Sequence, residues 1–322
     1  MIVTIVVVAV VAVPWSRGHR GRALRCARRS RTSPGGRGAT AGRRSGGHGD
    51  RDGGRAVRFD SGKAVAADGA AIAYQSAGNS DGRPLVLLAG QANNHRWWDS
   101  SRGDFEDAGY RTITLDWRGL GDSDKPDGLY STRGFAADVI AVLDEVGIAK
   151  AHVYGTSMGG RVAQWVAADF PGRVDSLVLG CTSPGGPHAV ERDKSVRRTL
   201  AQADRATAER FLLELMYTPA WLATHQGPYY VLGDPDMTAA ARRQHLTASA
   251  KHDAWDVLPS IAARTLVVHG TDDVFNPAAN APLLADRVPG ARQVLIEGAR
   301  HAYFDEFRGL AGAAVLEFLG SG

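Results

Sequence analysis

A serine between two glycines occupies the segment HVYGTSMGGRVAQ, residues 152–164. An apolar run enters the segment and a helical pattern leaves it, so Ser157 would lie on a sharp strand-to-helix turn. The flanking residues of such a turn must be small, because the serine takes a strained backbone conformation. The spacing therefore predicts Ser157 as a nucleophile. It also predicts that the backbone N–H of Met158, at the helix start, faces the negative charge that develops in the reaction.

A serine hydroxyl is protonated at neutral pH, so it needs a base, and the base needs a carboxylate to orient it. Candidates follow two later strands. The segment HGTDDVFNP offers Asp272 and Asp273, and the segment EGARHAYFDE offers His301. Because these groups all follow strand ends, we expect them to meet Ser157 at one edge of a parallel sheet.

Strands that alternate with helices must position these groups. Apolar and alternating runs predict two short strands around Asp68-Gly69 and further strands at 84–90, 110–116, 151–155, 174–180, 265–270 and 292–298. Three- and four-residue spacing predicts helices at about 100–108, 131–147, 158–170, 280–287 and 303–319. This alternation predicts an α/β fold with a doubly wound, mostly parallel sheet.

The alternation stops in one long segment. Residues 183–258 contain no convincing strand, two or three helical patterns and many aromatic residues. We expect this segment to form an all-helical lid over the carboxyl edge of the sheet, where such sheets bind ligands. The α/β core would then comprise residues 59–182 and 259–322.

Residues 64–320 resemble the α/β-hydrolase fold superfamily, and within it the small esterase, 3-oxoadipate enol-lactonase and cofactor-free haloperoxidase group. The likeness rests on the motifs GTSMG, DWRGLGDSDKP, GTDDVFNP and GARH, and on the chain order of serine, acid and histidine. The Gly-x-x-Asp-x-x-x-Pro pattern of this family falls on Gly270, Asp273 and Pro277. The resemblance therefore implies Asp273, rather than Asp272, as the acid.

The resemblance also implies a second oxyanion donor after the strand PLVLLAG, namely the backbone N–H of Gln91. Relatives usually carry His-Gly at this point, whereas this chain carries Ala89-Gly90. The sequence therefore does not tell which residues hold this loop in place. Four further side chains are candidate substrate contacts, with packing or a solvated loop position as the alternative for each: His95, Trp98, Tyr217 and Trp221.

The first 58 residues differ from the rest. They hold thirteen Arg and two Asp, a net charge of +11, so the overall +4 leaves −7 for residues 59–322. We expect residues 1–58 to be a disordered Arg/Gly-rich tail with a short apolar start, and translation to begin near Val57, so that residues 1–56 lie outside the native protein. Residues 1–13 are apolar but shorter than the about 20 residues of a membrane span. Membrane association through them is the alternative to the cytoplasmic location that we expect.

Together these patterns predict a serine hydrolase that cleaves a small carboxylic ester or lactone through an acyl-enzyme. Neither a metal nor an organic cofactor is expected. Four alternatives stay open: a cofactor-free haloperoxidase, a C–C bond hydrolase, a biosynthetic thioesterase, or a non-catalytic ligand receptor on the same triad. The expected partner is a small-molecule ester, lactone or thioester. The acidic folded part argues against nucleic acid, and the oligomeric state stays open.

Overall fold

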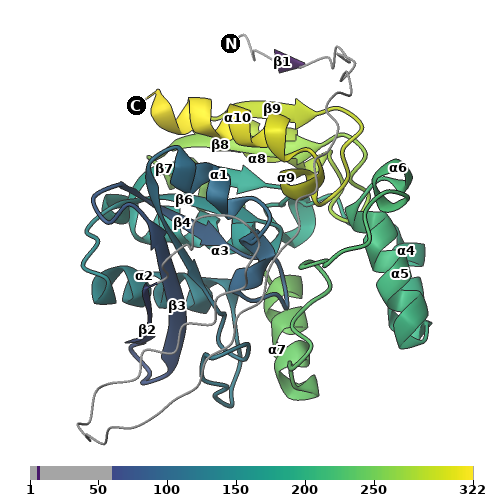
Figure 1. The fold of residues 1–322 in the computed structure, drawn as a ribbon, viewed down its shortest axis with the longest axis horizontal. Helices are drawn as coiled ribbons and strands as arrows, with labels where there is room; N and C mark the ends of the chain where they lie inside the picture. Colours follow the sequence, from purple (N-terminus) through teal and green to yellow (C-terminus); the bar gives the residue numbers. More distant parts are fainter. Residues whose placement is uncertain (1–5, 8–59, 322) are drawn as a thin grey trace, which may run out of the picture. The chain divides into compact units, whose positions relative to one another are not determined.

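A mostly parallel sheet forms the centre of the computed structural model, which describes residues 6–7 and 60–321 (Figure 1). The strands lie in the order β1-β9-β8-β7-β6-β4-β5-β3-β2. β3 pairs antiparallel with both β2 and β5, and the other pairs are parallel. The strands are β1 (Val6–Val7), β2 (Asp60–Val65), β3 (Ala71–Gly78), β4 (Arg83–Leu88), β5 (Tyr110–Leu115), β6 (Ala151–Thr156), β7 (Val174–Gly180), β8 (Arg264–Gly270) and β9 (Arg292–Ile296).

Helices cover both faces of this sheet. Successive side chains of a strand point to opposite faces, and accordingly Val86 and Leu88 of β4 belong to one apolar core and Leu85 and Leu87 to the other. The first core includes α2 (Thr132–Glu145), α3 (Met158–Asp169) and α8 (Asn280–Arg287). The second includes α1 (Arg102–Asp107) and α10 (Arg308–Gly320). The predicted α/β fold with a doubly wound sheet is confirmed.

Residues 183–258 fold as helices without a named strand. The segment holds α4 (Lys194–Gln202), α5 (Arg205–Met216), α6 (Pro219–Leu222) and α7 (Ala239–Ala250), which lie beside the sheet (Figure 1). Each of the four begins with a side chain that accepts a hydrogen bond from the first turn: Asp193, Asp204, Thr218 and Thr238. We call residues 183–258 the helical segment; its role as a lid stays a prediction.

One helix boundary differs from the prediction. The single helix expected at 303–319 is divided at Phe307 into α9 (Tyr303–Glu306) and α10. The carboxylates of α9 hold the helical segment, since Asp305 accepts from the Tyr217 hydroxyl at 2.6 Å and Glu306 from the Thr218 backbone N–H at 2.9 Å. These partners are distant in sequence, so helical periodicity alone does not reveal the division.

The expectations for the N-terminal tail lie outside the described residues, apart from Val6–Val7. Over residues 6–7 and 60–321, none of the helices combines the length and apolar character needed to cross a membrane.

A buried ion pair fixes the loop that follows β5. Arg118 of this loop binds Asp138 of α2 through two nitrogens, at 2.5 and 2.8 Å, and reaches Asp68 in the β2–β3 turn at 2.6 Å. Asp138 is fully buried. The pair thereby joins α2, the β2–β3 hairpin and the loop that carries the motif DWRGLGDSDKP.

Two glycines allow β6 to turn into α3. A methyl group on Gly155 would lie 2.2 Å from the carbonyl oxygen of Gly159, and one on Gly159 would lie 2.2 Å from the carbonyl oxygen of Leu88. Both contacts are with backbone atoms, which cannot move aside as a flexible side chain can. The glycines around Ser157 are therefore required by the close approach of α3 to β6 and β4.

We expect Asp138→Ala to lower the free energy of unfolding by about 3–5 kcal/mol, because it leaves the Arg118 charge without its buried partner. Asp144→Ala on the same helix is the control, since the Asp144 side chain is 62% exposed and pairs with Arg173 at the surface. This change should alter stability by less than about 1 kcal/mol. Urea denaturation measures both, and equal losses would contradict a special role for the buried pair.

We expect Gly159→Ala to destabilise the protein by about 1–3 kcal/mol or more, because its methyl group would overlap the end of β4. Gly103→Ala in α1 is the matched control, because a methyl group there meets no atom within 4 Å. It should stabilise by about 0.4–1 kcal/mol. Thermal and urea unfolding of the two variants test the opposite signs, and a stabilised Gly159→Ala would refute the packing argument.

Candidate active site

The turn between β6 and α3 holds Ser157 in a strained conformation. Its φ of 55° and ψ of −121° are unusual for a non-glycine residue. The backbone N–H of Ser157 donates to the Gly180 carbonyl of β7 at 2.9 Å, and the Thr182 hydroxyl donates to the Ser157 carbonyl at 2.7 Å. Ser157 itself is partly exposed, whereas the residues on either side are buried. The turn thus presents the serine predicted as the nucleophile at the carboxyl edge of the sheet.

Of the two aspartates after β8, the structure pairs Asp273 with His301. The Nδ1 atom of His301 lies 2.8 Å from Asp273 Oδ2, and both residues are buried. Asp273 Oδ1 accepts from the backbone N–H groups of Phe275 and Asn276, at 2.9 and 2.8 Å. Asp272 instead accepts from the neighbouring Thr271 hydroxyl at the surface. This arrangement can orient the imidazole through Nδ1.

The Asp273 carboxylate is stabilised in its ionised form. Burial by itself raises the pKa of Asp273, but the charge of His301 and the contacts of His269 and His301 outweigh it. The net effect holds the pKa of Asp273 below its usual range. His269, which ends β8, places Nε2 3.2 Å from Asp273 Oδ2 and 2.7 Å from the Asn276 carbonyl oxygen. A charged carboxylate at this position can accept a hydrogen bond from Nδ1–H of His301 and so orient the ring.

The other ring nitrogen of His301, Nε2, takes no part in the contact with Asp273. His301 Nε2 is buried and has no hydrogen-bond partner among the described residues, so Ser157 Oγ does not bond to it here. In enzymes without bound substrate such bonds are often long and tighten in the substrate complex. Because Nδ1 faces Asp273, Nε2 is the atom that can exchange a proton with a serine or a substrate.

A chain of contacts connects Ser157 with the Asp273–His301 pair. Ser157 bonds Gly180, and the next residue, Cys181, accepts from the Asn276 side chain at 2.6 Å through its carbonyl. Burial, reinforced by the Asp273 charge, raises the pKa of the Cys181 thiol well above its usual value. The thiol therefore stays protonated. The structure brings the ends of β6, β7 and β8 together as the sequence predicts.

The loop after β4 is braced by the helical segment. Asn93 donates through Nδ2 to the Gln91 carbonyl and accepts at Oδ1 from the Gly233 backbone N–H, both at 2.9 Å. The Asp234 backbone N–H donates to the Ala92 carbonyl at 2.7 Å. We call residues 91–93, which include the predicted oxyanion donor Gln91, the oxyanion loop. Although the histidine usual in relatives is missing, hydrogen bonds from 140 residues further along the chain hold this loop.

The oxyanion loop lies next to the start of α3. A methyl group on Gly159 would approach the Ala89 carbonyl oxygen to 2.7 Å, so the loop after β4 runs against the first turn of α3. The backbone N–H groups of Gln91 and Met158 belong to these two adjoining segments. Asn93 and Asp234 were not identified from the sequence. Such residues commonly bond to backbone in loops, but their type does not reveal so distant a partner.

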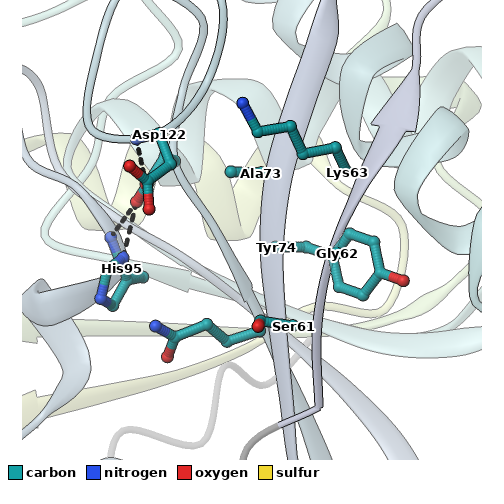
Figure 2. A pocket seen from close by; sticks show the side chains of 9 residues that line it. Ser61, Gly62, Lys63, Ala73, Tyr74, His95 and Asp122 are labelled. Carbon is teal, nitrogen blue, oxygen red and sulfur yellow. Dashed lines mark hydrogen bonds and ion pairs between the residues drawn. The ribbon is translucent and has the colours of Figure 1, made fainter. Parts of the chain in front are cut away.

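His95 lies at a separate cavity. Its Nδ1 atom and backbone N–H lie 2.7 and 3.0 Å from Asp116 Oδ1, and the Asp122 backbone N–H donates to the other carboxylate oxygen (Figure 2). With residues of β2 and β3, including Lys63, these side chains line a cavity of about 300 Å³. Ser157, Asp273 and His301 are not among its lining residues. The structure thus places His95 against Asp116, and a contact of His95 with substrate stays a prediction.

The aromatic candidates pack against one another. Trp98 is fully buried, with ring centroids 4.9 Å from Tyr154 and 5.3 Å from Phe304. It belongs to the core that includes α1 and α10, and its role as a substrate contact stays a prediction. Tyr217 is also fully buried and stacks on the half-buried Trp221 at 4.3 Å. Full burial excludes Trp98 and Tyr217 from solvent in this structure, and only Trp221 retains exposed surface.

Comparison with known proteins agrees with this architecture. The alpha/beta hydrolase fold family matches residues 83–307. A non-heme chloroperoxidase from Streptomyces lividans is 31% identical over 257 residues, which cover 74% of this chain and 92% of that protein. A hydrolase from Pseudomonas aeruginosa superposes with a TM-score of 0.70 at 29% identity, covering 81% and 99% of the two chains. An enol-lactonase from Burkholderia xenovorans superposes with a TM-score of 0.69 at 23% identity, covering 81% of this chain and 100% of that one. This likeness shows a common fold.

The matched region runs from β4 into the residues just after α9. It therefore takes in the strand–serine–helix turn and both loops that carry the Asp273–His301 pair. On this basis the chain belongs to the alpha/beta hydrolase fold family, and the protein is a hydrolase.

Proposed function

We propose that this hydrolase cleaves a small carboxylic ester or lactone through an acyl-enzyme on Ser157. The observation that carries the proposal is the orientation of His301. Its Nδ1 atom is held by a buried carboxylate, and its Nε2 atom has no partner among the described residues. This is the arrangement that a general base for a serine nucleophile requires.

In the acylation step, Ser157 Oγ attacks the carbonyl carbon while His301 Nε2 takes the hydroxyl proton. The carbonyl oxygen becomes an oxyanion, which the backbone N–H groups of Gln91 and Met158 bind. Asp273 stabilises the imidazolium through its Nδ1–H. Collapse of the tetrahedral intermediate breaks the bond to the leaving oxygen, which takes the proton back from His301.

In the deacylation step, His301 removes a proton from water, and the resulting hydroxide attacks the acyl carbon. A second tetrahedral intermediate forms at the same oxyanion donors. Its collapse releases the carboxylic acid, and the proton returns to Ser157 Oγ. Neither step uses a group beyond this chain, water and the substrate.

We expect Ser157→Ala to abolish both turnover of p-nitrophenyl esters and covalent labelling by a fluorophosphonate, because both reactions need the serine oxygen. Ser80→Ala, in an exposed loop, should retain both. Mass spectrometry locates the label, and steady-state assays of esters, lactones and acyl thioesters measure turnover. Labelling without turnover would favour a ligand receptor. Turnover retained in Ser157→Ala would refute the proposal.

The chloroperoxidase relative motivates one parallel assay. Halogenation of monochlorodimedone, measured with peroxide and a carboxylate buffer, distinguishes an oxidative role from ester cleavage on the same serine. A halogenation rate above the rate of ester turnover would displace ester hydrolysis as the proposed function.

We expect Asn93→Ala to lower kcat for esters by about 10- to 100-fold with a smaller change in KM. Loss of an entire oxyanion donor costs about 10²–10³ in kcat, and this variant only releases the loop that carries one. Asn94→Ala is the matched control, because among the residues that the structure describes the Asn94 side chain bonds the Arg96 backbone N–H alone. Steady-state kinetics separate kcat from KM. An unchanged kcat in Asn93→Ala would contradict a positioning role for the side chain.

A further inference from the structure

A positive charge without an acidic partner stands beside the Asp273–His301 pair. The Arg192 guanidinium lies over the Phe275 ring, with its Cζ atom 3.9 Å from the centroid, and the Phe275 ring meets His301 edge-on at 4.9 Å. Arg192 is half-buried. Within the part of the chain that the structure describes, no carboxylate forms an ion pair with it. The Phe275 ring thus contacts both the Arg192 guanidinium and the imidazole of His301, the proposed base.

The backbone next to Arg192 is held firmly in place. The fully buried Asn280 accepts from the Val190 backbone N–H at 2.8 Å and donates to the Val190 carbonyl at 2.9 Å. The adjacent acid, Glu191, turns to Arg197 at the surface, at 2.7 Å. The hydrogen bonds of Val190 therefore fix the backbone close to Arg192. Glu191, the acid next to Arg192 in sequence, is paired with Arg197 instead.

A second guanidinium on the same side also lacks an acid. Arg161 lies one turn after Ser157 on α3. Within residues 60–321 it donates only to neutral oxygens: the Ser249 carbonyl and hydroxyl, at 2.7 and 3.0 Å, and the Ser183 hydroxyl, at 2.9 Å. These bonds use three of its five N–H groups. Loss of solvent and the nearby Arg192 charge lower the pKa of Arg161 to about 10, so it remains charged at neutral pH.

Two such cations near a nucleophile favour an anionic ligand. Charges removed from water are normally paired, because the loss of hydration is costly. The buried Asp138, which is paired with Arg118, is an example of such pairing in this structure. A guanidinium binds a carboxylate through two parallel hydrogen bonds. The half-buried Arg192 guanidinium makes no hydrogen bond within residues 60–321 that would compete for these donors.

We propose that Arg192, with Arg161 beside it, binds a carboxylate group of the substrate. The preferred esters or lactones are then monoanionic derivatives of dicarboxylic acids, with the free carboxylate directed toward Arg192 and the scissile carbonyl toward Ser157. This inference names the substrate class of the site proposed above and rests on that function.

The first test compares two esters that differ in charge. Mono-p-nitrophenyl glutarate carries a free carboxylate, and p-nitrophenyl valerate is a neutral ester of similar length. We expect the native protein to favour the glutarate in kcat/KM by about 10-fold or more, and Arg192→Gln to lower this ratio by about 10- to 100-fold, the usual effect of losing a hydrogen-bonded charge. Arg192→Lys should keep part of the preference.

Arg198→Gln is the matched control, since Arg198 lies exposed on α4 and the change in net charge is the same. It should leave the ratio unchanged. If the native protein shows no preference for the glutarate, or if Arg192→Gln and Arg198→Gln change the ratio equally, the proposal is wrong.

The second test needs no catalysis. In the Ser157→Ala background, calorimetric titration with glutarate should show binding, and adding Arg192→Gln should weaken it by about 10-fold or more. If the native protein cleaves neither ester, the proposed function fails, and this titration still decides whether the anion site exists. The same titration is repeated with inorganic phosphate. Tighter binding of phosphate than of glutarate would overturn the assignment of the site to a carboxylate.

Discussion

The close contact between β4, β6 and the first turn of α3 is the constraint on which the site depends. Only hydrogen atoms fit between the Gly155 and Gly159 α-carbons and the backbone oxygens that face them. This packing fixes the direction in which α3 leaves the sheet, and with it the strained φ of Ser157. The same contact sets the loop after β4 beside the helix start. A single packing requirement therefore positions both the serine and the backbone that can bind an oxyanion.

Electrostatic pairing differs between the Arg118 cluster and the candidate active site. At Arg118, two carboxylates satisfy one guanidinium, and the cluster joins three elements without facing a substrate. At Asp273, one carboxylate oxygen is saturated by backbone N–H groups and the other holds His301. Arg192 has an aromatic ring in place of an acid. Among the described residues, Arg192 thus has no ion pair, whereas Arg118 and Asp273 have theirs.

The sequence predicts much of this because the signals are local. Periodicity identifies the strands from 64 onward, and Ser157, Asp273 and His301 each follow a strand end. What the sequence misses depends on distant partners. The division of the last helix at Phe307 coincides with ties from α9 to residues of the helical segment, and the brace at Asn93 comes from Gly233. An aromatic side chain such as Trp98 looks the same in a core as in a pocket until its neighbours are known.

The brace at the oxyanion loop restricts how the protein can admit a ligand. The backbone around Gly233 and Asp234 is tied to Ala92 and Asn93, and Asp234 Oδ2 also accepts from the Gly121 backbone N–H at 2.7 Å. An outward movement of this stretch would release the loop that carries Gln91, the predicted oxyanion donor. Residues 233–234 are therefore a point at which the helical segment is tied to the loops after β4 and β5, through these three hydrogen bonds.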